Sequence, residues 1–343
     1  MKRLVAGVMA ALAVLAGSGC GRAVGGAAVP AAPGADAGFF FSGPVPVYGQ
    51  TVGESDLATL AYLRALRRID VCALIRPEAL AKIGEIRSVG TLFALDECDT
   101  EIKLPGRADR RLVTVQLDLT RADRPVSFRA GDAEVYESAP GSCEFLTPLD
   151  LSRLPGAMRL RKPDQPFVRI GLIGESDCDV TRKVVGAIAA GIAAAPLPPR
   201  DAAAVYPSAL AERDPCEVLP AIAGELDHWD IGRSTPYRCD FAVWRDGLPA
   251  VMSMRLSLEP KIVEVVTEGT DHRTVDGTDV YLDPTFCSAV VFVGPPMQRR
   301  LPGGDFVDVD NVVVRPAVVV DSGGGDCAPV VDVAGSAAKL YQR

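Results

Sequence analysis

The fold is decided by the stretch YLRALRRIDVC, residues 62–72, because YPSALAERDPC at residues 206–216 repeats its pattern. Both stretches begin with tyrosine, carry Ala-Leu at the third and fourth positions after it, and end in Asp-x-Cys. The second copy begins 144 residues after the first. A pattern that returns at this distance predicts a tandem duplication, with units of about 140 residues.

The cysteines repeat in the same way. Apart from Cys20 there are eight, and their intervals are 26, 45 and 35 residues in the first set and 23, 48 and 40 in the second. An even number of cysteines in an exported protein favours disulfides over metal ligation, and no Cys-x-x-Cys pair is present. If the two units have the same connectivity, three pairings of the four cysteines in each unit are plausible. Of these we predict that the first cysteine pairs with the second and the third with the fourth. The predicted bridges are Cys72–Cys98, Cys143–Cys178, Cys216–Cys239 and Cys287–Cys327.

The amino terminus predicts an export signal. Lys2 and Arg3 precede an apolar run over residues 4–16, which is shorter than the roughly 20 residues of a membrane-spanning helix. The following Gly-Ser-Gly-Cys resembles the processing site of bacterial lipoprotein precursors, which implies that residues 1–19 are removed and that Cys20 carries the lipid. An ordinary secretory signal with a free thiol at Cys20 is the alternative. Residues 20–52, rich in Gly, Ala and Pro, predict a flexible tether that only Phe39 to Phe41 interrupts.

The remaining chain predicts an α+β fold of two tandem disulfide-tied domains. We place them at residues 53–195 and 205–343, with a proline-rich linker at 196–204. Apolar spacing predicts helices at residues 55–66 behind Ser55, at 76–86 and at 179–195 behind Asp179. Strands are expected at residues 110–119, 167–173 and 311–320, and a hairpin at 238–258. Each domain should therefore be an antiparallel sheet with N- and C-terminal helices packed on it.

The cysteine motifs resemble those of a known family. Asp-x-Cys-x-Leu-Ile at residues 70–75, its counterpart at residues 214–219, and Asp-Cys at residues 177–178 and 326–327 are similar to actinobacterial envelope lipoproteins of the uncharacterised DUF3558 type. More distantly, they are similar to the extracellular sensor domain of mycobacterial receptor kinases. The resemblance covers both units but not the tether, and it implies a fold without implying a chemistry. Asp99 and Asp240, directly after the second cysteine of each set, depart from the family's usual aromatic or Arg near that position.

Composition and motifs restrict the possible chemistry. The formal net charge of −8 becomes more negative when Lys2 and Arg3 are removed, and we identify no dense local cluster of Lys and Arg, so no nucleic-acid binding is expected. Membrane contact is expected through the lipid anchor alone. No Gly-x-Ser-x-Gly motif occurs, and the acidic residues at 268–279 lack calcium-loop spacing, so we predict a solvated hairpin tip there and neither a metal nor a cofactor. His228 and Trp229 together form the candidate ligand-binding pair.

The sequence therefore predicts a non-catalytic extracytoplasmic lipoprotein on the outer face of the cytoplasmic membrane. It would bind or sense a small envelope ligand or a protein partner, either near His228 and Trp229 or at the junction of the two units. The alternatives are an envelope hydrolase that uses acidic residues such as Asp227 and Asp230, and a structural spacer. A concave site that holds two carboxylates in opposed pKa environments would favour the hydrolase.

Overall fold

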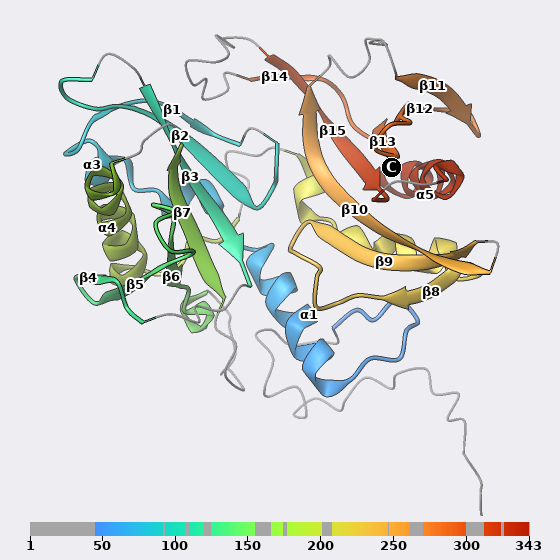
Figure 1. Ribbon diagram of the computed structural model, residues 1–343, viewed down its shortest axis with the longest axis horizontal. Helices are drawn as coiled ribbons and strands as arrows, with labels where there is room; N and C mark the ends of the chain where they lie inside the picture. Colours follow the sequence, from blue (N-terminus) through green and yellow to red (C-terminus); the bar gives the residue numbers. More distant parts are fainter. Residues whose placement is uncertain are drawn as a thin grey trace, which may run out of the picture.

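A computed structural model describes residues 45–91, 93–107, 110–119, 125–154, 166–173, 177–200, 208–245, 247–260, 270–299, 312–323 and 326–342. The predicted signal, Cys20, Phe39 to Phe41 and most of the tether lie outside these residues, as do residues 201–204 of the predicted linker. The described chain contains two antiparallel sheets, helices and four disulfides, so the predicted pair of disulfide-tied α+β units is confirmed. Figure 1 shows the two sheets side by side, one built from the first half of the chain and one from the second.

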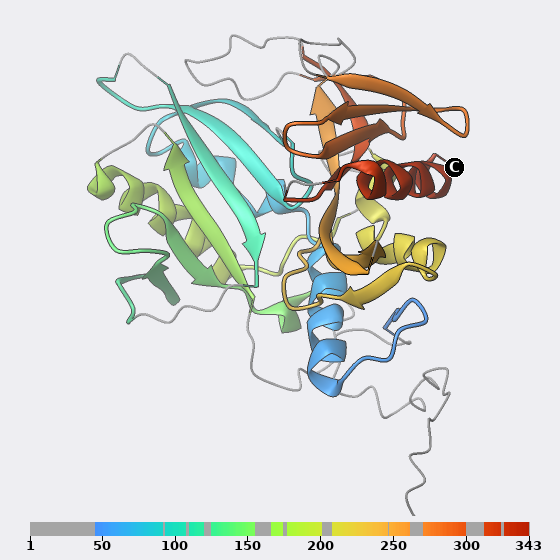
Figure 2. The same cartoon turned by 45° about the vertical axis from the view of Figure 1, so that its right-hand side comes forward.

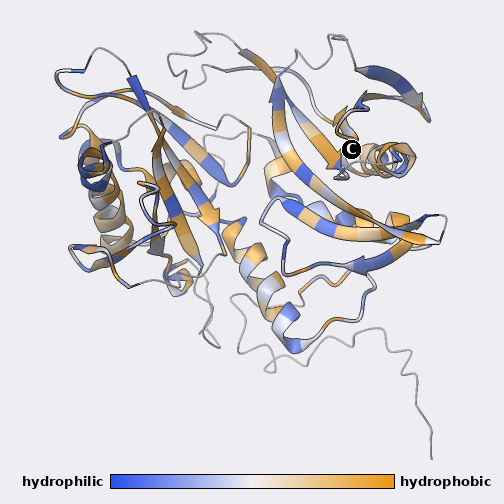
Figure 3. Cartoon of the chain, in the orientation of Figure 1, coloured by the Kyte–Doolittle hydropathy of each residue, from blue (hydrophilic) through white to orange (hydrophobic). Residues whose placement is uncertain are grey.

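The first sheet has seven strands in the order β1-β2-β3-β7-β6-β5-β4. These strands are β1 (Glu85–Gly90), β2 (Glu97–Lys103), β3 (Arg110–Asp118), β4 (Phe128–Ala130), β5 (Ala133–Glu137), β6 (Phe145–Pro148) and β7 (Phe167–Ile173). On β3 the side chains of Val113, Val115 and Leu117 are buried, whereas Thr114 and Gln116 between them are half-buried. This alternation confirms the predicted strand with one wet face, and Figure 3 shows the mixed colouring of the strands.

The second sheet repeats the arrangement. Its eight strands are β8 (Leu226–Trp229), β9 (Arg238–Arg245), β10 (Leu248–Pro260), β11 (Asp271–Val275), β12 (Thr278–Asp283), β13 (Ser288–Phe292), β14 (Met297–Arg299) and β15 (Val312–Asp321). The order β8-β9-β10-β15-β13-β12-β11 matches that of the first sheet strand for strand, and β14 is an addition that pairs with β15. The predicted β9–β10 hairpin is present, and Gly247 has the positive φ that its turn requires. Two sheets of the same order confirm the tandem arrangement.

Each sheet carries a C-terminal helix on one face. Helix α4 (Cys178–Ala194) packs on β4, β5 and β7, and α5 (Ala328–Tyr341) packs on β12, β13 and β15. Val184 and Ile188 of α4 are buried against the sheet, as the four-residue apolar spacing predicts. The helix begins earlier than expected, because Asp177, rather than Asp179, is the N-cap and accepts a 3.0 Å hydrogen bond from the Asp179 N–H.

The helices at the start of each unit differ from the prediction. Helix α1 (Glu54–Leu66) is present, but Gly53 is its N-cap and Ser55 lies inside it. The helix expected at residues 76–86 is wrong: α3 (Pro77–Leu80) ends after four residues and β1 begins at Glu85. Gly84 marks the change from helix to strand, because the chain there comes so close to β2 that a Cβ would lie 2.6 Å from the Lys103 carbonyl oxygen. Only glycine fits this approach, which lets β1 pair with β2. In the second unit the corresponding helices are of the 3-10 type, η2 (Ala209–Glu212) and η3 (Pro215–Ile222).

The covalent frame follows the predicted connectivity. The disulfides join Cys72 to Cys98, Cys143 to Cys178, Cys216 to Cys239, and Cys287 to Cys327, with Cα separations between 5.0 and 5.2 Å. In both units the first bridge ties the segment after Asp-x-Cys to the second sheet strand, α2 (Val71–Leu74) to β2 and η3 to β9. The second bridge ties the start of the C-terminal helix to the opposite half of the sheet. Each disulfide therefore lies within one unit.

The units meet where residues 93–95, just before β2, reach β10 of the second unit, with an isolated antiparallel bridge between Ala94 and Ser257. In Figures 1 and 2, α4 lies on the left side of the molecule and α5 on the right. Buried apolar residues of the two units form one continuous cluster, and α1 extends the contact by packing Leu60 and Leu63 against Ile231. Across the described ranges no helix is both long and apolar enough to cross a membrane.

Candidate ligand-binding site at the junction of the units

A cavity of about 550 Å³ lies where the two sheets meet. One wall comes from the first unit, with Phe93, Ala94 and Asp96 before β2 and Gln116 to Asp118 on β3. The other comes from the second unit, with Thr235, Tyr237 and Arg238 around the start of β9 and residues 255–257, 259 and 260 of β10. The volume falls within the usual range for small-molecule sites, which often lie between domains.

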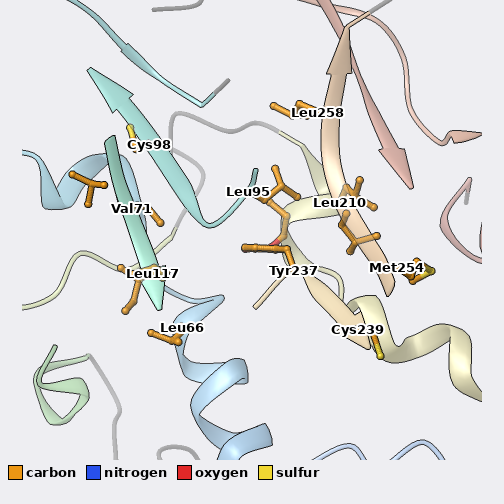
Figure 4. Packing of buried hydrophobic residues seen from close by; sticks show 14 of the residues in the cluster. Leu66, Val71, Leu95, Cys98, Leu117, Leu210, Tyr237, Cys239, Met254 and Leu258 are labelled. Carbon is orange, nitrogen blue, oxygen red and sulfur yellow. The ribbon is translucent and has the colours of Figure 1, made fainter. Parts of the chain in front are cut away.

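Residues 93–95 of the first unit connect the two units through backbone hydrogen bonds and a buried side chain. The Leu258 N–H donates a 2.9 Å hydrogen bond to the Phe93 carbonyl, and Ala94 forms an isolated antiparallel bridge with Ser257. Leu95 is fully buried in the same contact, beside Leu210, Tyr237 and Leu258 (Figure 4). Phe93 lines the cavity and is 46% exposed. The segment thus presents an accessible aromatic ring from a fixed backbone.

The charged side chains of the cavity are matched by neighbours of opposite charge. Arg255 lies 3.7 Å from Glu259 and 3.4 Å from Asp321, and Arg238 lies 2.7 Å from Asp240. Asp118 accepts a 3.0 Å hydrogen bond from the Arg169 Nε. Because these charges are compensated within the protein, the cavity is polar without a strong field of either sign.

Two carboxyls in the cavity hold their protons more tightly than usual. The pKa of Asp96 is raised to about 6, mainly by burial and in part by the charge of nearby Asp118, while a backbone hydrogen bond and Arg200 oppose the shift. Burial also raises the pKa of Glu259, although hydrogen bonds from Ser257 and Arg255 work against it. The pKa values of these two carboxyls move in the same direction, which differs from the opposed pair that we associate with the hydrolase.

The predicted pair of His228 and Trp229 lies elsewhere, on the edge strand β8. The His228 ring is exposed and its Nδ1 lies 2.9 Å from the Asp227 carboxylate. Trp229 packs into the apolar cluster beneath α1 and lies edge-on to Tyr48, with 5.8 Å between ring centroids. The two side chains are therefore not brought together, and neither lines the junction cavity.

The other histidine lies on the predicted hairpin tip. Strands β11 and β12 pair there, and the His272 Nε2 lies 3.0 Å from Asp279 while its ring stacks on Tyr281. Among the residues that the structure describes, no group of three or more His, Cys, Asp or Glu is placed to hold a metal ion.

The residues that form the cavity were not singled out from the sequence. Phe93 and Asp96 lie in TLFALDEC, residues 91–98, immediately before the second cysteine of the first set. Their position next to one of the repeated cysteines could have drawn attention to them. That position does not predict their contact with β10 of the other unit. No family model matches the chain, and neither curated proteins nor solved structures include a significant match.

Proposed function

We propose that the protein is a non-catalytic, extracytoplasmic lipoprotein that binds a small envelope ligand in the junction cavity. The observation that carries this proposal is a cavity of about 550 Å³ with walls from both units. A spacer needs no such concavity, whereas small-molecule sites often lie between domains. Lipid at Cys20 would hold the protein at the outer face of the cytoplasmic membrane.

The ligand class follows from the lining. Compensated charges disfavour a strongly charged molecule, whereas the Gln116 amide and the Asp96 carboxyl offer hydrogen bonds. The exposed ring of Phe93 offers apolar contact to the same molecule. We therefore infer a neutral ligand that is rich in hydroxyl groups and has one apolar face, such as a glycan unit of the envelope.

The purified protein can be tested with neutral oligosaccharides and polar envelope extracts, with native mass spectrometry to detect and identify what remains bound. Phe93→Ser should weaken binding about tenfold, because it removes an aromatic contact worth on the order of 1–3 kcal/mol. Phe286→Ser is the matched control, because Phe286 is 70% exposed and lies outside the cavity. Gln116→Trp should fill the cavity and abolish binding.

The ligand proposal fails if no neutral ligand is retained. It also fails if Phe93→Ser and Phe286→Ser weaken binding equally, since the loss would then follow surface hydrophobicity and not the cavity.

One observation favours a second candidate function, hydrolysis of the bound ligand. Asp96, with its pKa raised to about 6, and Asp118, which is ion-paired with Arg169, line the same cavity, and two neighbouring carboxyls, one of them with a raised pKa, form an arrangement that glycoside hydrolases use. Incubation of the protein with the retained ligand distinguishes the two. Turnover by the wild type that disappears in Asp96→Asn, while binding persists, would replace the binding proposal with the hydrolase.

The anchor is tested by Cys20→Ser. We expect the substitution to move the protein from the membrane fraction to the soluble fraction or to leave an uncleaved precursor, because the serine cannot accept the lipid. Wild-type fractionation and migration of the variant would refute the lipid anchor without bearing on the cavity.

A further inference from the structure

A second cavity at the junction, of about 530 Å³, has a different chemistry. Arg64 of α1 and Arg67 and Arg68, which directly follow α1, line it together with Arg200, which follows the first unit's C-terminal helix. The first three belong to the stretch YLRALRRIDVC and lie on one side of the helix because they are three and four residues apart. The fold thus gathers four guanidinium groups in a protein whose formal net charge is −8.

The acidic residues of this cavity are largely engaged. Asp214 forms an ion pair with Arg67, and its other oxygen accepts a 3.0 Å hydrogen bond from the Cys216 N–H. Glu217 accepts a 3.0 Å hydrogen bond from the Nε of Arg213, which is a fifth arginine beside the cavity. Glu212 is exposed at the end of the preceding 3-10 helix, η2. Four arginines thus line the cavity beside three carboxylates.

Arg200 adds a fixed donor to this group. Its NH2 group lies 3.4 Å from the Ile69 carbonyl oxygen and 3.2 Å from the Leu95 carbonyl oxygen, and its guanidinium lies over the Tyr237 ring at 5.6 Å. Carbonyl groups and an aromatic ring orient a guanidinium without removing its positive charge. The Arg200 guanidinium is consequently a positively charged group whose position is fixed by residues of both units.

Comparison of the two copies indicates that the shared strand order does not require arginine at positions 64 and 68. When the tyrosines are aligned, Ser208, Ala211 and Glu212 occupy the positions of Arg64, Arg67 and Arg68. The second unit builds a sheet of the same strand order with these uncharged or acidic residues. The basic cluster is thus a property of one copy, located where that copy meets the other.

We propose that this cavity binds a phosphate monoester or diester, supplied either by a soluble metabolite or by a lipid headgroup. Guanidinium groups match phosphate oxygens in a bidentate geometry, and several of them around a concave site give both affinity and orientation. The proposal concerns a different cavity and a different ligand class from the proposed function, so either can fail alone.

Isothermal titration of the purified protein with glycerol phosphate, at about 0.15 M salt to suppress loose ion pairing, tests the site. The double variant Arg64→Gln/Arg68→Gln should reduce the affinity by about tenfold or more, because two charge-assisted contacts are lost. Arg87→Gln/Arg273→Gln removes the same charge from exposed strand positions outside the cavity and should leave the affinity unchanged. Arg68→Gln alone, at an exposed position, serves if the double variant does not fold.

Vesicles identify the source of the phosphate. Binding to phosphatidylglycerol vesicles that is lost in the Arg64/Arg68 variant assigns the site to a lipid headgroup, whereas binding of glycerol phosphate without vesicle binding assigns it to a soluble ester. Absence of binding to both probes overturns the proposal. An equal loss of binding in the control variant also overturns it, since net charge would then explain the effect.

Discussion

At the scale of single residues, the junction contains acidic groups that are costly to ionise. Asp96 is 5% exposed and its pKa is raised to about 6, from an ordinary value near 4. The neighbouring Glu97 has its pKa raised to about 8, first by burial and then by the charges of Asp99 and Asp96. These carboxyls make the stability of the junction depend on pH.

The sign of this dependence can be tested with Asp96→Asn. Between about pH 4 and pH 6 the folded protein keeps the Asp96 proton while the unfolded chain loses it, so rising pH favours unfolding. The stabilising contribution is fully present below pH 4 and is lost as the pH rises through 6, by on the order of 3 kcal/mol. Urea unfolding over this range should therefore show a steeper loss of stability in the wild type than in Asp96→Asn. Exposed Glu85→Gln is the control, and parallel curves for wild type and Asp96→Asn would contradict the expectation.

The ion pair between Arg67 and Asp214 joins the two copies of the repeated stretch at a largely buried position, with side-chain exposures of 11% and 17%. Arg67 also donates a 3.0 Å hydrogen bond to the Pro236 carbonyl. We expect Arg67→Gln to lower the free energy of unfolding by about 3 kcal/mol, because it leaves a buried carboxylate without its cation. Arg87→Gln, which breaks an exposed pair with Glu85, should cost less than about 1 kcal/mol. If the two variants lower the free energy of unfolding equally in chemical denaturation, the buried Arg67 pair contributes no more to stability than the exposed Arg87 pair.

At the scale of elements, the two C-terminal helices approach their sheets differently. A Cβ on Gly335 of α5 would lie 2.7 Å from a methyl carbon of Val275 on β11, whereas a Cβ on Gly186 of α4 would meet its nearest neighbours at 3.7 Å. Alanine is about 1 kcal/mol better than glycine inside a helix, so Gly186→Ala should stabilise the protein by up to that amount. Gly335→Ala should instead destabilise it by about 1 kcal/mol, because overpacking against a stiff β-branched side chain exceeds the helix gain. Thermal denaturation measures both, and a stabilising Gly335→Ala would show that α5 can move away from β11.

Elements whose signal is local could be predicted from the sequence, and those set by distant contacts could not. Four-residue spacing of Val180, Val184 and Ile188 is sufficient for α4, and matched cysteine intervals are sufficient for the disulfides. The apolar residues at 76–86 also fit a helix. In the structure, however, Gly84 lies too close to the backbone of β2 for a side chain, and the chain continues from there as strand β1, which pairs with β2. Trp229 and His228 are adjacent in sequence, yet the packing of α1 on β8 buries one ring and leaves the other in solvent.

At the scale of the whole molecule, the two units share one core. The buried cluster is continuous from α3 and α4 in the first unit to α5 in the second, and the junction residue Leu95 belongs to it. Domains that share a core and a bridge between their sheets should unfold together. Cooperative unfolding is consistent with a junction that presents two cavities of fixed shape.

The tryptophans allow this cooperativity to be measured, because both, Trp229 and Trp244, lie in the second unit. Leu80→Ala removes a fully buried side chain from the first unit and should cost about 3 kcal/mol. If the units unfold together, the midpoint of urea unfolding followed by tryptophan fluorescence will fall even though the substitution lies in the other unit. Phe286→Ala, at an exposed site, is the control. An unchanged fluorescence midpoint in Leu80→Ala would mean that the second unit unfolds independently.

The cavity between two sheets of the same strand order also has an evolutionary consequence. Each wall is encoded by a separate copy of one ancestral unit, so a substitution in one copy alters one wall and leaves the opposite wall intact. The copies can therefore diverge independently while the disulfides and cores that both inherited preserve the scaffold. Paralogues with the same cysteine intervals can in this way come to recognise different molecules.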